Sequence, residues 1–130
     1  MDLPPPIVTQ EVRIVDASGQ PRIVMSAETG NPTIQLFRDD GTAGATLQLN
    51  AAGRPALTLS NPVPDEPNAA IEIDDKGAHV KFGGKGDASS YLFLNNAGGS
   101  GVVLVDVAGT RRFEAVVAPD GTTTLRGIND

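Results

Sequence analysis

The sequence predicts an all-β protein of about ten short, mainly antiparallel strands joined as a meander. Three observations support this fold class: evenly spaced glycines, apolar residues at fixed distances after each glycine, and the absence of a helical pattern. Asn and Asp often precede these glycines, and such residues favour turns because the side chain bonds nearby backbone and Gly reaches positive φ without steric cost. The turn glycines, 11 or 12 residues apart or about twice that, are Gly19, Gly30, Gly41, Gly53, Gly77, Gly98, Gly109 and Gly121.

The segment after each turn glycine alternates in polarity. The residue four positions after the glycine is apolar in seven of eight repeats, Lys81 being the exception. The residue six positions after it is also mainly apolar, whereas the one between them is mixed. This period of two predicts strands with one face on a core. The two apolar sets run from Ile23, Ile34, Ala45 and Leu57 to Leu125, and from Met25, Leu36, Leu47 and Leu59 to Ala115.

Helices are not expected, because every window with helical apolar spacing is interrupted by Gly or Pro. Pro21, Pro32 and Pro55 each stand two residues after a turn glycine. That is the first position of the following strand, where a missing N–H need not break a ladder hydrogen bond. The prolines therefore mark strand starts.

We divide the chain into a Pro-rich arm, residues 1–10, and a single β-repeat domain, residues 11–130. Two segments interrupt the repeat: 61–68, which is rich in proline, and 83–90, which is rich in Gly and Ser. Both are interpreted as loops of one domain. A boundary near residue 65 is the alternative, although about 65 residues would give each half a small core.

Two architectures can bury the apolar faces. One is a barrel or sandwich closed within the chain; the other is a flat meander, β-prism or solenoid-like array that completes its core against copies of itself. Ile, Leu, Val and Ala dominate the inward positions, which favours thin layers about 10 Å apart and hence the second architecture. We therefore expect a homo-oligomer, with a trimer as the working guess. The stiff Pro4–Pro6 run either lies along a neighbouring subunit or forms a free tail.

Composition excludes several classes of function. The net charge is -6, with only ten Lys and Arg residues, so neither nucleic acid nor an anionic membrane is expected as a partner. The chain has no cysteine, which excludes disulfides, thiolate metal sites and Cys nucleophiles. No signal peptide or transmembrane segment is predicted, because the start is acidic and no apolar run reaches about 20 residues. The cytoplasm and a virion or similar assembly remain as locations.

Few residues are candidates for catalysis, and an enzyme is not expected. His79, the single histidine, is placed on the strand face opposite Val80 and Phe82 and is interpreted as a surface residue. Two acid pairs precede turn glycines, and carboxylates that converge from separate turns can form an acid–base dyad. The residues worth testing for such a hydrolase are Asp39, Asp40, Asp74 and Asp75.

Ligand binding is the other alternative, with no cofactor expected beyond Ca²⁺. Gly83–Asp87 resembles the calcium-binding repeat Gly-Gly-x-Gly-x-Asp, but the Asp comes one residue early and no second copy follows. Aromatic platforms for sugars are scarce, since Tyr91 is the sole Tyr and Trp is absent. The candidate ligand-binding residues are Asp87, Ser89, Ser90 and Tyr91.

The regular repeat and the scarcity of catalytic residue types favour a non-enzymatic structural or assembly module that self-associates through its β-repeats. A carbohydrate- or calcium-binding β module is the first alternative, and an acid-dyad hydrolase is the second. The departures from the repeat at 61–68 and 83–90 are where a function other than scaffolding is expected first.

Overall fold

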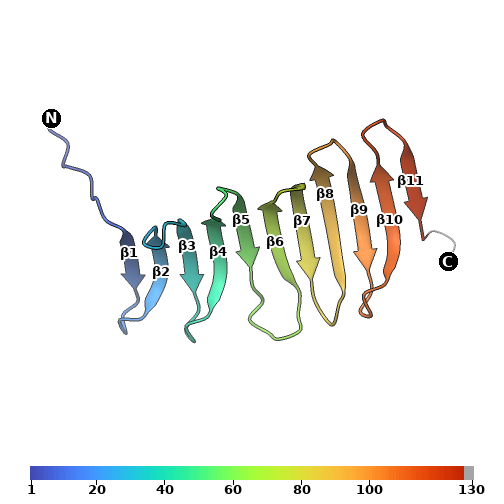
Figure 1. Cartoon of the computed structure of the whole chain (residues 1–130). Helices are drawn as coiled ribbons and strands as arrows, with labels where there is room; N and C mark the ends of the chain where they lie inside the picture. The colour runs from blue at the N-terminus through green and yellow to red at the C-terminus, as the bar shows by residue number, and fades with distance from the viewer. Residues whose placement is uncertain (128–130) are drawn as a thin grey trace.

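The computed structural model describes residues 1–127, which form one antiparallel sheet of eleven strands in sequence order (Figure 1). Residues 1–10 precede the first strand and extend away from the sheet. The strands are β1 (Glu11–Val15), β2 (Pro21–Ser26), β3 (Thr33–Phe37), β4 (Ala43–Leu49), β5 (Pro55–Leu59), β6 (Asn68–Ile73), β7 (Gly77–Gly83), β8 (Ser89–Asn95), β9 (Ser100–Val105), β10 (Arg111–Val117) and β11 (Thr123–Arg126).

The repeat arises from one type of turn used again and again. At the first turn the Gly19 N–H donates to the Asp16 carbonyl (3.0 Å) and the Asp16 N–H donates to the Gln20 carbonyl (2.9 Å). Gly19 has a φ of 86°, as expected for a turn that ends in a glycine bulge. The same pair of backbone bonds recurs at Arg38–Thr42, Asn50–Arg54, Asp106–Thr110 and Ala118–Thr122. An identical turn at each of these connections fixes the 11 to 12-residue spacing.

The all-β meander is confirmed, with eleven strands where about ten were expected. Within residues 1–127 there is no helix, and the sheet is open: β1 pairs only with β2, and β11 only with β10. Of the two architectures, the chain by itself therefore adopts the flat meander and not a closed barrel. Two sheet edges and two full faces are left uncovered in the single chain.

Both predicted interruptions are connections, and they lie side by side. The connection between β5 and β6 spans residues 60–67, and that between β7 and β8 spans 84–88. Pro67 lies against Gly84, close to the position that a Cβ there would take, and the Asp87 N–H donates to the Val107 carbonyl (3.0 Å). Strands β7 and β8 extend further into 83–90 than expected. The β5–β6 and β7–β8 connections and the β9–β10 turn thus lie next to one another along the lower edge of the sheet in the view of Figure 1.

The sequence-based register is wrong in one repeat, the one that follows Gly77. There the Asp74 N–H donates to the Gly77 carbonyl (2.9 Å), and β7 already begins at Gly77. This turn is shorter than the others, so the alternation shifts by one residue. Phe82 pairs with Ala69 and Ser90 on the apolar face, whereas Lys81 lies on the opposite face.

Candidate functional site

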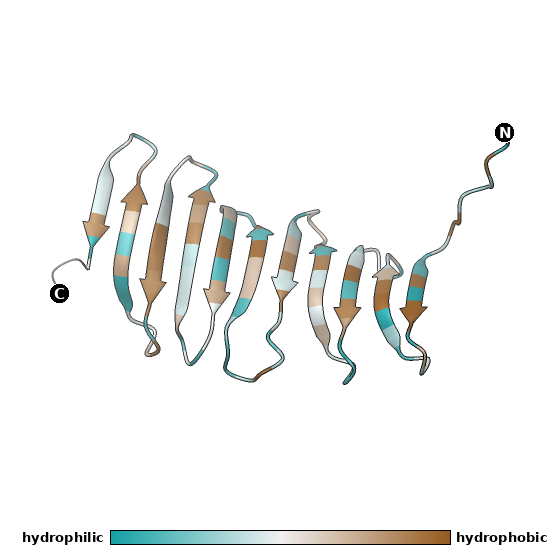
Figure 2. Ribbon diagram, turned by 180° about the vertical axis from the view of Figure 1, so that it is seen from behind, coloured by the Kyte–Doolittle hydropathy of each residue, from teal (hydrophilic) through white to brown (hydrophobic). Residues whose placement is uncertain are grey.

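One face of the sheet is apolar along its whole length. Paired residues share a face, and the strand pairing places a continuous central row of apolar side chains there, one from every strand. Figure 2 shows the resulting alternation of apolar and polar bands along the strands. The central row consists of Val12, Met25, Ile34, Leu47, Leu57, Ile71, Val80, Leu92, Val102, Ala115 and Leu125.

Two further rows flank the central row on the same face, and none of the three rows contains a charged residue. The lower row, nearer the β1–β2 turn, consists of Ile14, Ile23, Leu36, Ala45, Leu59, Ala69, Phe82, Ser90, Leu104 and Phe113. The upper row is formed from β4 onward by Leu49, Pro55, Ile73, Ala78, Leu94, Ser100, Val117 and Thr123. We call the three rows together the apolar face.

The side chains of the apolar face are left open to solvent by the single chain. Leu47 is 47% exposed, Ile71 53% and Leu92 56%. Among the residues that the structure describes, the buried hydrophobic residues are Val24 and Val103, and both lie on the other face. The apolar face therefore has the side chains typical of a hydrophobic core, but within the single chain no second layer covers them.

The total surface area gives the scale of this exposure. The chain exposes 9284 Å², whereas a compact monomer of 13.4 kDa exposes about 6,500 Å². The excess is about 2,800 Å², to which the extended arm and the uncovered faces both contribute. An apolar patch on a typical monomer covers only a few hundred Å², and larger ones mark interaction surfaces.

The opposite face, which we call the polar face because it carries charged residues such as Lys81 and Glu114, also holds apolar side chains such as Phe93. It has an open hollow of about 820 Å³ over β7–β10. Tyr91 and Phe93, whose ring centroids are 6.1 Å apart, line it together with Lys81, Arg111 and Glu114. Val103 lies beneath and is 1% exposed. We interpret this hollow as a small secondary core with a charged rim.

His79 lies at the margin of this hollow, on the face opposite Val80 and Phe82 as expected. It is not a free surface residue: the Glu72 carboxylate on the paired strand lies 2.6 Å from its Nε2, and the side chain is only 18% exposed. Asp74 Oδ2 lies 3.8 Å from Nδ1. Ligand atoms of these three residues lie within 4.8 Å of one another and could hold a divalent cation. In the structure Glu72 and His79 form a cross-strand hydrogen-bonded pair, with the turn acid Asp74 beside it.

The two predicted acid pairs lie at opposite ends of the strands. Asp39 and Asp40 belong to the β3–β4 turn at the lower edge, and Asp74 and Asp75 to the β6–β7 turn at the upper edge (Figure 1). The sheet therefore does not bring the four carboxylates into one pocket.

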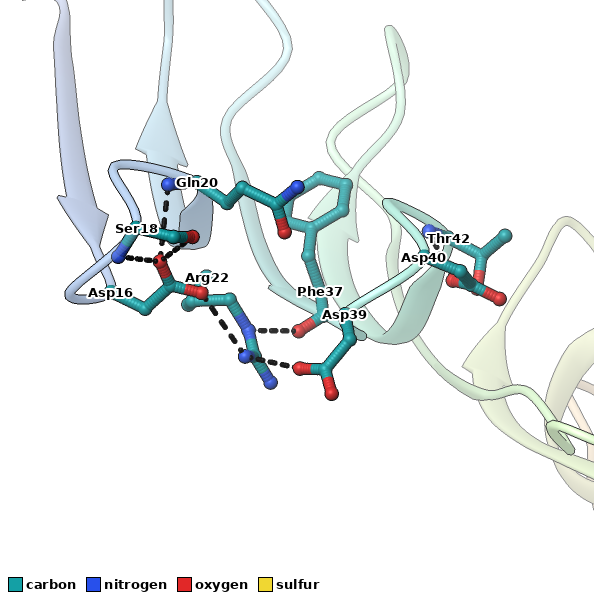
Figure 3. A network of polar contacts seen from close by, with 8 residues as sticks. All are labelled: Asp16, Ser18, Gln20, Arg22, Phe37, Asp39, Asp40 and Thr42. Atoms are coloured by element: carbon teal, nitrogen blue, oxygen red, sulfur yellow. Dashed lines mark hydrogen bonds and ion pairs between the residues drawn. The ribbon is translucent and has the colours of Figure 1, made fainter.

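Three of these four carboxylates, those of Asp39, Asp40 and Asp74, are bound to neighbouring groups. Arg22 Nη1 lies 2.6 Å from Asp39 Oδ1, whereas Asp40 Oδ1 accepts hydrogen bonds from the Thr42 N–H and hydroxyl (Figure 3). Asp74 Oδ1 accepts the N–H groups of Lys76 and Gly77. Asp40 and Asp74 thus hold turns in shape.

These hydrogen bonds favour the charged carboxylate and lower its pKa. The Thr42 hydroxyl and N–H lower the pKa of Asp40, and the Lys76 N–H lowers that of Asp74. The pKa values of Asp16, Asp106 and Asp120 are lowered in the same way by the Ser18 hydroxyl, the Arg112 guanidinium and the Thr122 N–H respectively. Five turns thus depend on an ionised carboxylate.

Acid should therefore destabilise the fold. Because the folded pKa of each turn carboxylate lies below its unfolded value of about 3.9, the stabilisation is present above that pH and is lost as the pH falls below it. We expect the free energy of unfolding, measured by denaturant titration at fixed protein concentration, to drop between about pH 5 and about pH 2, a range that includes the unfolded pKa. Asp40→Asn keeps a side-chain oxygen that accepts the turn hydrogen bonds, as Asn50 Oδ1 does in its own turn. The free energy of unfolding of this variant should therefore drop less at low pH. Equal stability at both pH values would contradict this role.

The predicted ligand-binding residues are divided by the strand alternation. Ser89 and Tyr91 point to the polar face, whereas Ser90 pairs with Phe82 and Leu104 on the apolar face. Asp87 lies in the connection before β8, with its Cβ 3.3 Å from the position that a Cβ on Gly109 of the β9–β10 turn would take. Tyr91 alone of the four lines the polar hollow.

No family model, curated protein or solved structure matches the chain. Across the part of the chain that the structure describes, no helix is long and apolar enough to cross a membrane. The class of protein defined by the fold and its surfaces is a single-layer antiparallel β-meander with one continuous apolar face.

Proposed function

We propose that the chain is a non-enzymatic structural or assembly module that associates with other copies of itself through the apolar face. The observation that carries the proposal is the central row, apolar in all eleven strands, with side chains such as Leu92 (56% exposed) open to solvent. Leaving this face in water is unfavourable at roughly 25 cal/mol per Å² of apolar surface. A second layer removes that cost.

Another copy of the chain is the partner whose surface fits this face. The apolar face is long and narrow, eleven strands by two or three side chains, and a copy presents a face of the same length. Stable specific interfaces bury about 1,200–2,000 Å² in total, and obligate ones more. The excess surface of about 2,800 Å² per chain, part of which belongs to the extended arm, compares with the roughly 600–1,000 Å² that each partner contributes to such an interface.

The mass in solution tests this proposal. Size-exclusion chromatography with light scattering should give a whole multiple of 13.4 kDa, unchanged on dilution through the micromolar range. A homogeneous 13.4 kDa species at high protein concentration would overturn the proposal. The same measurement distinguishes a defined oligomer from open-ended aggregation, which gives a mass that rises with concentration.

A further inference from the structure

The two flanking rows of the apolar face alternate in side-chain size along the sheet, and they do so in opposite phase. In each strand from β4 to β9 one flank holds a small residue and the other a larger one. Reading lower row then upper row, the pairs are Ala45 and Leu49, Leu59 and Pro55, Ala69 and Ile73, Phe82 and Ala78, Ser90 and Leu94, Leu104 and Ser100.

The cause of the alternation is visible in the sequence. On the apolar face, each of these strands begins with its smaller residue and ends with its larger one, as in Ala45 to Leu49 of β4. Because consecutive strands are antiparallel, the small residue falls in the lower row in one strand and in the upper row in the next. Each flank is therefore corrugated with a repeat of two strands.

From this complementarity we propose that the copies pack parallel and in register around an axis that runs along the sheet from β1 to β11. Rotation about such an axis brings the lower row of one copy against the upper row of the next, at the same strand. Ala45 then meets Leu49 of the neighbour, and Phe82 meets Ala78. Every level from β4 to β9 combines one small and one larger side chain, as close packing requires. This inference rests on the proposed self-association.

Antiparallel pairing of two copies fits less well. Rotation about an axis along β6 covers all eleven strands but places Ala69 against Ala69 and Leu59 against Phe82, which leaves gaps and clashes. Shifting that axis to lie between β6 and β7 restores the size match, for example Ala45 against Leu104. The shift leaves β1, with Val12 and Ile14, uncovered. Of these three arrangements, the parallel one alone covers every strand and also matches the sizes from β4 to β9.

Engineered disulfides test the arrangement directly, because the natural chain has no cysteine. In Ala45→Cys/Leu49→Cys the two cysteines lie on one strand, about 13 Å apart, which is beyond the roughly 7 Å that a disulfide spans. A bond can therefore form only between chains. We expect the oxidised double variant to run as covalent dimers or trimers on a non-reducing gel, and each single variant as a monomer. Ala69→Cys/Ile73→Cys should behave likewise at the level of β6.

The outcomes separate this inference from the proposed function. A wild-type oligomer whose double variants form no bond at either level would overturn the parallel arrangement while leaving self-association intact. Cross-linking of Ala45→Cys/Leu104→Cys in place of Ala45→Cys/Leu49→Cys would overturn it in favour of the shifted antiparallel pair. A monomeric wild type would overturn self-association itself. The mass of the covalent product gives the number of copies, because a dimer and a trimer both satisfy the row pairing.

A size swap provides a second measurement without cysteines. Ala45→Leu should weaken association about tenfold or more, because the added side chain meets Leu49 of the neighbour. Ala45→Leu/Leu49→Ala should return the dissociation constant to within about threefold of wild type. The two residues do not touch within one chain, so rescue reports contact between chains. A double variant as weak as the sum of its single variants would contradict the arrangement.

Discussion

Leu47→Asp should dissociate the oligomer, whereas Gln48→Asp should leave it intact. Leu47 occupies the central row and Gln48 the adjacent position on the polar face of the same strand. Association would bury the new carboxylate at residue 47 among apolar side chains without a partner, which costs about 3–5 kcal/mol. That corresponds to at least a hundredfold rise in the dissociation constant for each charge buried.

The Gln48→Asp variant controls for the effect of Asp on strand stability, since both positions lie in β4 and both side chains are exposed in the single chain. Light scattering at several concentrations, together with circular dichroism to verify the strand content, measures the difference. We expect the Leu47→Asp chain at 13.4 kDa over concentrations at which Gln48→Asp keeps the wild-type mass. Equal masses for the two variants would show that the apolar face is not the interface.

Much of the fold could be predicted from the sequence because its information is local. Each turn is specified within five residues, as at Asp16–Gln20, where the Asp16 carboxylate accepts the Ser18 N–H and Gly19 takes a positive φ. Alternation then assigns the faces. The assignment failed only after Gly77, where a shorter turn shifted the phase by one residue, and a glycine interval alone does not distinguish the two kinds of turn.

Whether the acids could meet depends on long-range order that the repeat alone does not supply. Successive turns of a meander alternate between the two edges of the sheet, so two turns share an edge only when an even number of strands separates them. Three strands, β4, β5 and β6, lie between the Asp39–Asp40 turn and the Asp74–Asp75 turn. Interpreting 61–68 as a loop gives this count, but the edge that each turn occupies also depends on every strand pairing with the next one, which the repeat does not show. The Glu72–His79 pair was missed for a similar reason, because it depends on the register of β6 against β7.

The sequence predicted which residues of the apolar face point inward, but it did not predict that this face is left uncovered within the chain. The same alternation is produced by a closed barrel, a sandwich or a flat sheet. Only the open topology shows that residues such as Ile71 have no second layer above them within the chain. The size alternation of the flanks likewise emerges only when strand directions are known, although the order of small then large in each strand from β4 to β9 can be read from the sequence.

Gly77→Ala should be more destabilising than Gly53→Ala, because two constraints meet at Gly77. Its φ is 151°, and an added Cβ would lie 2.3 Å from the Leu94 carbonyl oxygen and 2.6 Å from the Asn95 Cα on the paired strand. Backbone of β8 would have to move, and we expect a loss of about 3 kcal/mol or more in the free energy of unfolding. Gly53→Ala is the matched control: its φ is 76°, and no atom lies within 4 Å of the added Cβ.

The control should cost only the conformational penalty of a left-handed residue, about 1–2 kcal/mol. Denaturant titration of both variants at one protein concentration measures the difference, since stability that includes association depends on concentration. Equal losses would mean that the close approach of β7 to β8 at Gly77 is not a packing constraint. A larger loss at Gly77 would show that the shortened turn, which shifts the register of β7, is held by a contact that only glycine permits. The placement of Phe82 on the apolar face and of His79 beside Glu72 would then follow from this one residue.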